Sequence, residues 1–228
     1  MAGYVFDDAV AEVFPDMIKR SAPGYQGIID YMPVFAERFV QTNTLCYDLG
    51  CSLGASAFSL IKGFPDRSVK VIAVDNSKSM IQRLNQTLKK EKPSSVILPV
   101  CSNLTDIRIT NASVIILNFT LQFLHPQERS SLLHRLYLGL IDGGVLILSE
   151  KIRFADDRHQ NLQTDLHHTF KRQQGYSDLE ISQKRTALEN VLLPETVDDH
   201  LKRLKESGFC IAAQWFQNFN FVSFYAVK

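Results

Sequence analysis

The chain has 228 residues, 45% of them hydrophobic, which is enough to bury one substantial core. Its 25 Lys and Arg residues nearly balance 24 Asp and Glu, and a net charge of +1 argues against a broad nucleic-acid-binding face. There is no run of about 18 apolar residues, no basic and apolar leader, and no CxxC pair or disulfide-framework spacing among four cysteines, so we expect a soluble, cytoplasmic protein without a membrane segment.

Residues 5–40 have the apolar spacing of helices, interrupted by a break at residues 21–25. Pro15 predicts either a kink in the first helix or the start of a second one. Tyr25 lies within the predicted break. From these residues alone, its simplest interpretation is an aromatic side chain packed in a loop.

A short apolar strand over residues 45–49 leads into a turn of small residues and then a helix over about 55–62. Gly50 and Gly54 permit positive φ angles and let a ligand approach the backbone closely. Asp48 is a candidate to accept a hydrogen bond from a ligand amine. The alternative is an ordinary turn between a strand and a helix, without a ligand.

A second strand is predicted over residues 69–74, followed by Asp75 and an amphipathic helix. In nucleotide-binding βαβ units, an acid at this strand end accepts the ribose hydroxyl groups. The competing role for Asp75 is to cap the helix that follows, although Asn76 or Ser77 is able to do so instead.

Three more strands are predicted over residues 95–100, 112–118 and 145–149, the last after a turn at 142–144. Strands that alternate with helices predict an open α/β sheet, in which ligands bind beyond the carboxyl ends of the strands. The glycine or polar residues expected at those ends are Gly50, Asp75, Asn103 and Asn118. Their convergence favours a ligand site at this edge.

The rest of the chain divides into a helical segment, 151–208, and two closing strands. Ser177 and Glu180 have capping-box spacing, and Gly208 is a predicted helix C-cap. Adjacent histidines at 167 and 168 lack the i, i+4 spacing of helical metal ligands, so no metal site is expected. Strands over 209–216 and 219–227 predict an antiparallel hairpin at a sheet edge.

This order of elements, with the motif DLGCSLG at residues 48–54, resembles the S-adenosylmethionine-dependent methyltransferase fold. The resemblance implies an α/β, Rossmann-like architecture: a mostly parallel seven-stranded sheet with a C-terminal antiparallel hairpin and a helical insertion. We expect one S-adenosylmethionine-binding domain over residues 1–228. Its predicted parts are N-terminal helices at 1–42, a cofactor-binding core at 43–150, a helical insertion at 151–208 and a closing hairpin at 209–228.

Residues 12–25, 47–54, 117–124 and 176–190 are very similar to the bacterial carboxy-S-adenosyl-L-methionine synthase family. The resemblance implies that S-adenosyl-L-methionine and prephenate are substrates, and no metal is expected from the histidine spacing. Prephenate loses its ring carboxylate as carbon dioxide, and the deprotonated methyl carbon on sulfur captures it. A partner tRNA carboxymethyltransferase then transfers the new group to 5-hydroxyuridine at the tRNA wobble position.

The resemblance also assigns the site. The residues that it implies contact S-adenosyl-L-methionine are Tyr25, Gly50, Cys51, Ser52, Asp75, Asn76, Asn103, Leu104, Asn118 and Arg185. Arg185 is the implied catalytic residue, an arginine for the new carboxylate, reaching into a neighbouring subunit's site in a homodimer. From sequence alone it reads as a surface arginine. Asn103 replaces the family's usual aspartate and keeps the ability to bind an adenine amine.

Two other classes of function remain as alternatives. A conventional S-adenosylmethionine-dependent methyltransferase acting on a small molecule or tRNA shares every motif up to residue 150. A non-enzymatic cofactor- or tRNA-binding scaffold is disfavoured because the net charge of +1 and the absence of a basic tract predict no direct tRNA binding. The spacing of Gly50 and Gly54 does not match the G-x-G-x-x-G motif of dehydrogenases.

Overall fold

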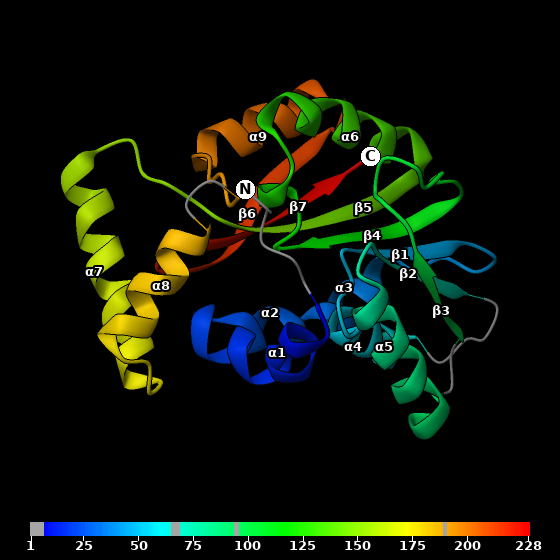
Figure 1. Cartoon of the computed structure of the whole chain (residues 1–228). Coiled ribbons are helices and arrows are strands. Elements are labelled where there is room, and N and C mark those ends of the chain that lie inside the picture. Colours follow the sequence, from blue (N-terminus) through cyan, green and yellow to red (C-terminus); the bar gives the residue numbers. More distant parts are fainter. Residues whose placement is uncertain (1–6, 65–68, 94–95, 189–190) are drawn as a thin grey trace.

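The computed structural model describes residues 7–64, 69–93, 96–188 and 191–228, with side chains 184–188 outside the description. Its centre is a seven-stranded sheet of order β3-β2-β1-β4-β5-β7-β6 (Figure 1). The strands are β1 (Leu45–Leu49), β2 (Lys70–Asp75), β3 (Val96–Cys101), β4 (Ala112–Asn118), β5 (Leu140–Lys151), β6 (Ile211–Asn218) and β7 (Phe221–Val227). The first five are parallel, and β7 is antiparallel to β5 and β6. This confirms the predicted fold class.

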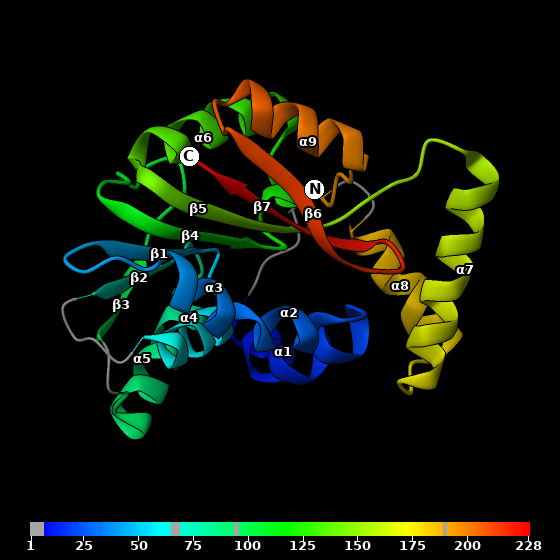
Figure 2. The same cartoon turned by 180° about the vertical axis from the view of Figure 1, so that it is seen from behind.

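Helices cover both faces of the sheet, as Figures 1 and 2 show from opposite sides. The helices on one face and at its end are α1 (Asp8–Ser21), α2 (Tyr25–Asp30), α3 (Met32–Phe39), α4 (Ala55–Leu60) and α5 (Lys78–Glu91). The opposite face carries α6 (Pro126–Gly139) and α9 (Val197–Glu206). Helices α7 (Asp157–Gln173) and α8 (Asp178–Leu188) stand beyond the carboxyl ends of the parallel strands. Short 3₁₀ turns occupy Ile61–Gly63 and Leu121–Phe123.

Strand β4 shows why the sheet forms the centre of the protein. Its first six residues are buried, and their side chains alternate between the two faces. Ile115 and Leu117 join the core beneath α6, whereas Val114 and Ile116 join the core beneath α3 and α4. A strand buried on both faces reads as a continuous apolar run, which made β4 predictable to the residue.

Three local predictions need correction. The predicted turn at 142–144 lies inside β5, because Leu140 already pairs with Ala112 and Gly144 accepts a hydrogen bond from the Lys228 backbone. The hairpin turn is at 219–220 and not 217–218, since Asn218 still pairs with Phe221. Tyr25 lies at the first position of α2 and not in a break.

Three other local predictions have a definite outcome in the structure. Pro15 lies inside one helix, α1, so it does not begin a second one. Ser177 and Glu180 exchange the hydrogen bonds of a capping box. The C-cap of α9 is Ser207, and Gly208, predicted as the cap, is the next residue, with φ +112°. No helix in the described part of the chain is both long and apolar enough to cross a membrane.

Candidate active site

Backbone hydrogen bonds hold the turn after β1 against the end of β2. Gly50 has φ +76°, and the N–H groups of Gly50 and Cys51 both donate to the carbonyl oxygen of Val74, across 2.8 and 2.9 Å. A Cβ atom at Gly50 would lie 2.2 Å from Oγ1 of Thr120, so only glycine fits. The backbone of this turn is therefore fixed beside the strand ends, and at residues 50–52 it carries only small side chains.

The Asp75 carboxylate is held between two turns. Its Oδ2 atom accepts from the backbone N–H of Ser52 at 2.9 Å, and Oδ1 accepts from that of Ser77 at 2.8 Å. The Ser77 hydroxyl caps α5 by accepting from the N–H of Met80, as the alternative in the sequence allowed. Burial raises the pKa of Asp75, and the backbone hydrogen bonds oppose that shift. Asp75 is thus free of capping and available to a ligand's hydroxyl groups.

The end of β3 supplies the next wall. Asn76 Nδ2 lies 3.5 Å from Oδ1 of Asn103, and Asn103 Nδ2 donates to Asp106 across 3.4 Å. Arg135 donates to the carbonyl oxygens of Leu104 and Thr105, both at 2.6 Å. These bonds fix the loop 103–105, so its backbone presents a defined edge to a ligand.

Asn118 has both ends of its amide assigned by hydrogen bonds. Nδ2 donates to the Ser56 hydroxyl at 2.9 Å, and Oδ1 accepts from the Ser149 hydroxyl at 2.6 Å. The Tyr25 ring lies near Phe119, with 6.3 Å between ring centroids. Burial, with a smaller effect of Asp48, raises the pKa of Tyr25, so its hydroxyl stays protonated.

These elements line one cavity of about 760 Å³, within the size range of small-molecule sites. Nine of the ten predicted site residues line it: Tyr25, Gly50, Cys51, Ser52, Asp75, Asn76, Asn103, Leu104 and Asn118. The tenth, Arg185, lies on α8, and its side chain is outside the described residues. Its predicted role stays a prediction.

Asp48 does not take the role considered for it. It is 2% exposed, and its Oδ2 atom accepts from the backbone N–H of Ala57 at 3.1 Å. Burial raises the pKa of Asp48 to about 7. Because the side chain points into the protein beneath α4, it supports the turn from below and does not line the cavity.

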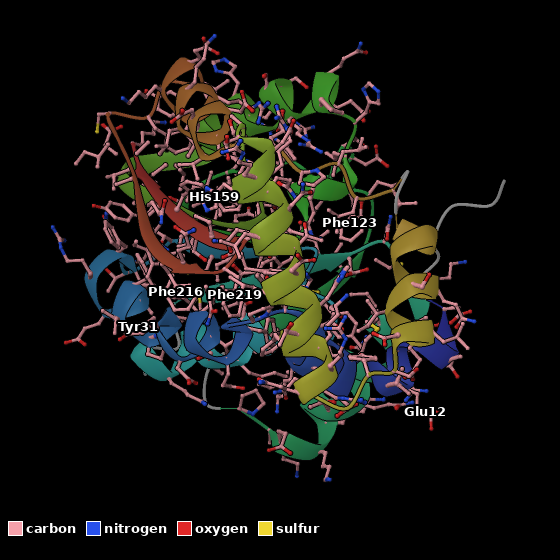
Figure 3. The ribbon with its side chains drawn as sticks, turned by 90° about the vertical axis from the view of Figure 1, so that its left-hand side faces the viewer. Glu12, Tyr31, Phe123, His159, Phe216 and Phe219 are labelled. Atoms are coloured by element: carbon pink, nitrogen blue, oxygen red, sulfur yellow. The ribbon has the colours of Figure 1, made fainter. Side chains whose placement is uncertain are left out.

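The cavity also has walls that sequence reasoning missed. Lys151 ends β5, while His167 and Lys171 come from α7, and Phe123 and Phe221 add aromatic surface. In Figure 3, which looks onto this side of the molecule, α7 and α8 stand in front and Phe123 is labelled between them. Lys151 lies two residues beyond the predicted end of the fifth strand, because β5 continues to Lys151, so the predicted strand end did not point to it.

His167 is held neutral within this wall. Its Nε2 atom lies 2.8 Å from the carbonyl oxygen of Ser21, and the side chain is buried. Burial first, then the charge of Lys151, lowers the pKa of His167 to about 3. No group of three or more His, Cys, Asp or Glu side chains able to hold a metal occurs within the described ranges.

Comparison with known proteins shows which fold the chain has. A family model described as a methyltransferase domain matches residues 47–144. A putative S-adenosyl-L-methionine-dependent methyltransferase from Methanococcus maripaludis superposes with a TM-score of 0.63 at 19% identity, covering 100% of this chain and 96% of the other. An O-methyltransferase family protein from Burkholderia thailandensis gives a TM-score of 0.70 at 14% identity, but this chain spans only 60% of it. These likenesses show the fold.

Sequence relatives are more specific. Proteins named carboxy-S-adenosyl-L-methionine synthase are 52% identical in Trichlorobacter lovleyi, over 99% of this chain and 93% of that protein, and 49% identical in Geobacter sp. strain M21, over 100% and 94%. The protein of that name from Salmonella paratyphi B is 50% identical over 100% of this chain and 92% of its own length. The chain therefore belongs to the carboxy-S-adenosyl-L-methionine synthase family.

Proposed function

We propose that this enzyme converts S-adenosyl-L-methionine and prephenate into carboxy-S-adenosyl-L-methionine and phenylpyruvate. The observation that carries the proposal is one cavity with two chemically different halves, in a chain about 50% identical to synthases of this name. One half is built from the ends of β1, β2 and β3. The other is built from the ends of β4 and β5 together with α7.

The first half fits S-adenosyl-L-methionine. Asp75 presents carboxylate oxygens that suit ribose hydroxyl groups, and Asn103 and the Leu104 backbone suit the polar edge of adenine. The glycine turn, Gly50 to Ser52, lines the cavity and would lie against the methionine moiety. Tyr25, from α2, and Asn118, from the second half of the cavity, would then enclose the sulfonium end.

The second half fits an anionic substrate with an apolar body. Lysine side chains at 151 and 171 supply positive charge, and Phe119, Phe123 and Phe221 supply apolar walls. Capture of carbon dioxide needs both substrates held together where water is scarce. In the balanced reaction, prephenate yields phenylpyruvate, carbon dioxide and hydroxide. The hydroxide combines with the proton lost from the sulfonium methyl group, and that carbon bonds to carbon dioxide.

The role of Arg185 is part of the proposal and rests on the family resemblance. An arginine binds a carboxylate through two parallel hydrogen bonds, which suits the group created in the product. We also propose a homodimer. Leu162 and Leu166, one turn apart on α7, and Leu179 on α8 expose 57%, 37% and 67% of their surface, and such apolar patches are typical of protein interfaces.

The use of the product and the cellular location are also proposed, on the basis of the family resemblance. The product would be consumed by a tRNA carboxymethyltransferase that modifies the wobble uridine, without direct tRNA binding by this chain. A cytoplasmic location is consistent with four free cysteine thiols.

The test is mass spectrometry of the nucleoside products after incubation with S-adenosyl-L-methionine, with and without prephenate. We expect a species heavier by one carbon dioxide, formed only with prephenate. Arg185→Ala should abolish it, whereas Arg172→Ala, at an exposed arginine paired with Asp178, should retain it. If S-adenosyl-L-methionine stays unmodified under both conditions, the proposed synthase activity is refuted and methyltransferase activity is favoured. Undiminished product from Arg185→Ala would refute only the role of that residue.

A further inference from the structure

Lys151 is a cation in the cavity wall that pairs with no anion among the residues that the structure describes. It is the last residue of β5, and its backbone N–H donates to Oε1 of Gln122 at 3.0 Å, which fixes the strand end. Its side chain is half-buried, and its ammonium group makes no hydrogen bond or ion pair with the described residues. Burial lowers the pKa of Lys151.

The described carboxylates that line the cavity, Asp75 and Glu128, have hydrogen-bond partners other than Lys151. Asp75 accepts from two backbone N–H groups, and Glu128 accepts from the N–H of His125 in the cap of α6. Glu150, next to Lys151 in β5, points to the opposite face of the sheet and accepts from the N–H of Leu121. A partly desolvated ammonium with no counter-ion among the described residues is unfavourable, so the site is suited to receive an anionic ligand.

The neighbours of Lys151 add to this preference. His167 stays neutral and uses Nε2 on the carbonyl oxygen of Ser21, so it does not repel a cation or neutralise an anion. Its ring packs edge-on against Phe221, with centroids 5.1 Å apart. The positive charge therefore lies next to an aromatic wall, which matches a carboxylate joined to an apolar ring system.

We propose that Lys151 binds the pyruvyl carboxylate of prephenate, the one retained in phenylpyruvate, and not the ring carboxylate that leaves. The inference rests on the proposed function. A departing carboxylate must give up its negative charge, so a cation paired with it would stabilise the substrate more than the transition state and slow the reaction. A cation on the retained carboxylate holds the molecule in place through the whole reaction without that cost.

The experiment measures binding of prephenate and of phenylpyruvate, by calorimetry, to protein loaded with S-adenosylhomocysteine, which has no methyl group on sulfur. Phenylpyruvate has only the pyruvyl carboxylate. Lys151→Met should lower the affinity for both ligands by a similar factor, about 10- to 100-fold. Lys151→Arg should restore much of the affinity. Lys70→Met, at an exposed lysine of β2, is the control and should bind both as the wild type does.

Three results would overturn the inference. Weaker binding of prephenate alone would assign Lys151 to the ring carboxylate, and unchanged binding of both would remove it from the subsite. Affinity for S-adenosyl-L-methionine and the thermal unfolding temperature are measured for each variant, with Lys151→Gln as a second variant if Lys151→Met does not fold. A loss of S-adenosyl-L-methionine binding equal to that of prephenate would also count against a selective role.

The same measurements separate this inference from the proposed function. If the wild type makes no carboxy-S-adenosyl-L-methionine but binds both acids in a Lys151-dependent way, the proposed role of Lys151 stands and the proposed reaction is wrong. If product forms normally and both affinities are unchanged in Lys151→Met, the reaction holds and the subsite is wrong.

Discussion

The backbone N–H of Ser52 donates a hydrogen bond to Oδ2 of Asp75, across 2.9 Å. This bond joins the glycine turn after β1 to the acidic end of β2, and the other carboxylate oxygen accepts from Ser77. Asp75 thus organises two ligand-facing turns at once. Its substitution should affect ligand binding through the turn as well as through lost contacts.

We expect Asp75→Asn to weaken binding of S-adenosyl-L-methionine about 10- to 100-fold, because an amide keeps only one acceptor oxygen for two N–H donors and the ribose. Calorimetric titration measures the change. The control is Asp142→Asn, an exposed aspartate away from the cavity. Equal affinities in the two variants would show that Asp75 does not contribute to the site.

Gly50→Ala should lower the free energy of unfolding more than Gly143→Ala does. Both glycines have positive φ, +76° and +75°, and this backbone strain costs an alanine about 1–2 kcal/mol. Only at Gly50 would the new Cβ collide with Thr120, whereas at Gly143 the nearest atom is 4.0 Å away. Overpacking adds about 1–3 kcal/mol. Urea unfolding of the two variants measures the difference, and equal losses would contradict the steric account.

Arg129→Met should destabilise the protein by about 3–5 kcal/mol. The Arg129 side chain is fully buried, pairs with Glu195 at 2.5 Å, and donates to the carbonyl oxygens of Leu124 and Leu193. It therefore ties two segments of the cavity wall together, and its loss leaves Glu195 partly unpaired.

Arg83→Met is the matched control for this prediction, because Arg83 makes a partly exposed pair with Asp8. Such a pair contributes about 0–1 kcal/mol. Urea unfolding of both variants at one pH gives the comparison. The prediction fails if Arg129→Met costs no more than Arg83→Met.

His200→Phe should make stability less sensitive to acid. His200 is 1% exposed, neither ring nitrogen has a hydrogen-bond partner in the described part of the chain, and the ring lies 5.4 Å from that of Phe224. Burial is the main cause that lowers its pKa from 6.5 to about 4. The unfolded chain therefore binds a proton more readily than the folded one between these values.

The direction of the pH dependence of stability follows from this difference in pKa. Stability supported by neutral His200 is present above pH 6.5 and is lost as the pH falls toward 4. The wild type should lose about 2 kcal/mol between pH 7 and pH 5 through this residue. Unfolding curves of His200→Phe and wild type should diverge over that range. Parallel curves would show that His200 does not titrate as described.

The parallel strands and their polar ends were predictable because both depend on local patterns. Strand β4 is a continuous apolar run, and Asp75 and Asn118 directly follow such runs. Right-handed crossovers between parallel strands then bring these ends to one edge, whatever the surface residues are. This is why nine residues proposed from sequence and resemblance line one cavity.

Only the tertiary structure decided what each polar group does there. Asp48 is as polar and as near a strand end as Asp75, but packing of α4 over it turns one inward while the other faces the cavity. Lys151 and His167 are 16 residues apart in sequence, and their shared wall depends on how α7 lies against the sheet edge. Burial, pairing and charge arise from segments distant in sequence, and local patterns carry no information about them.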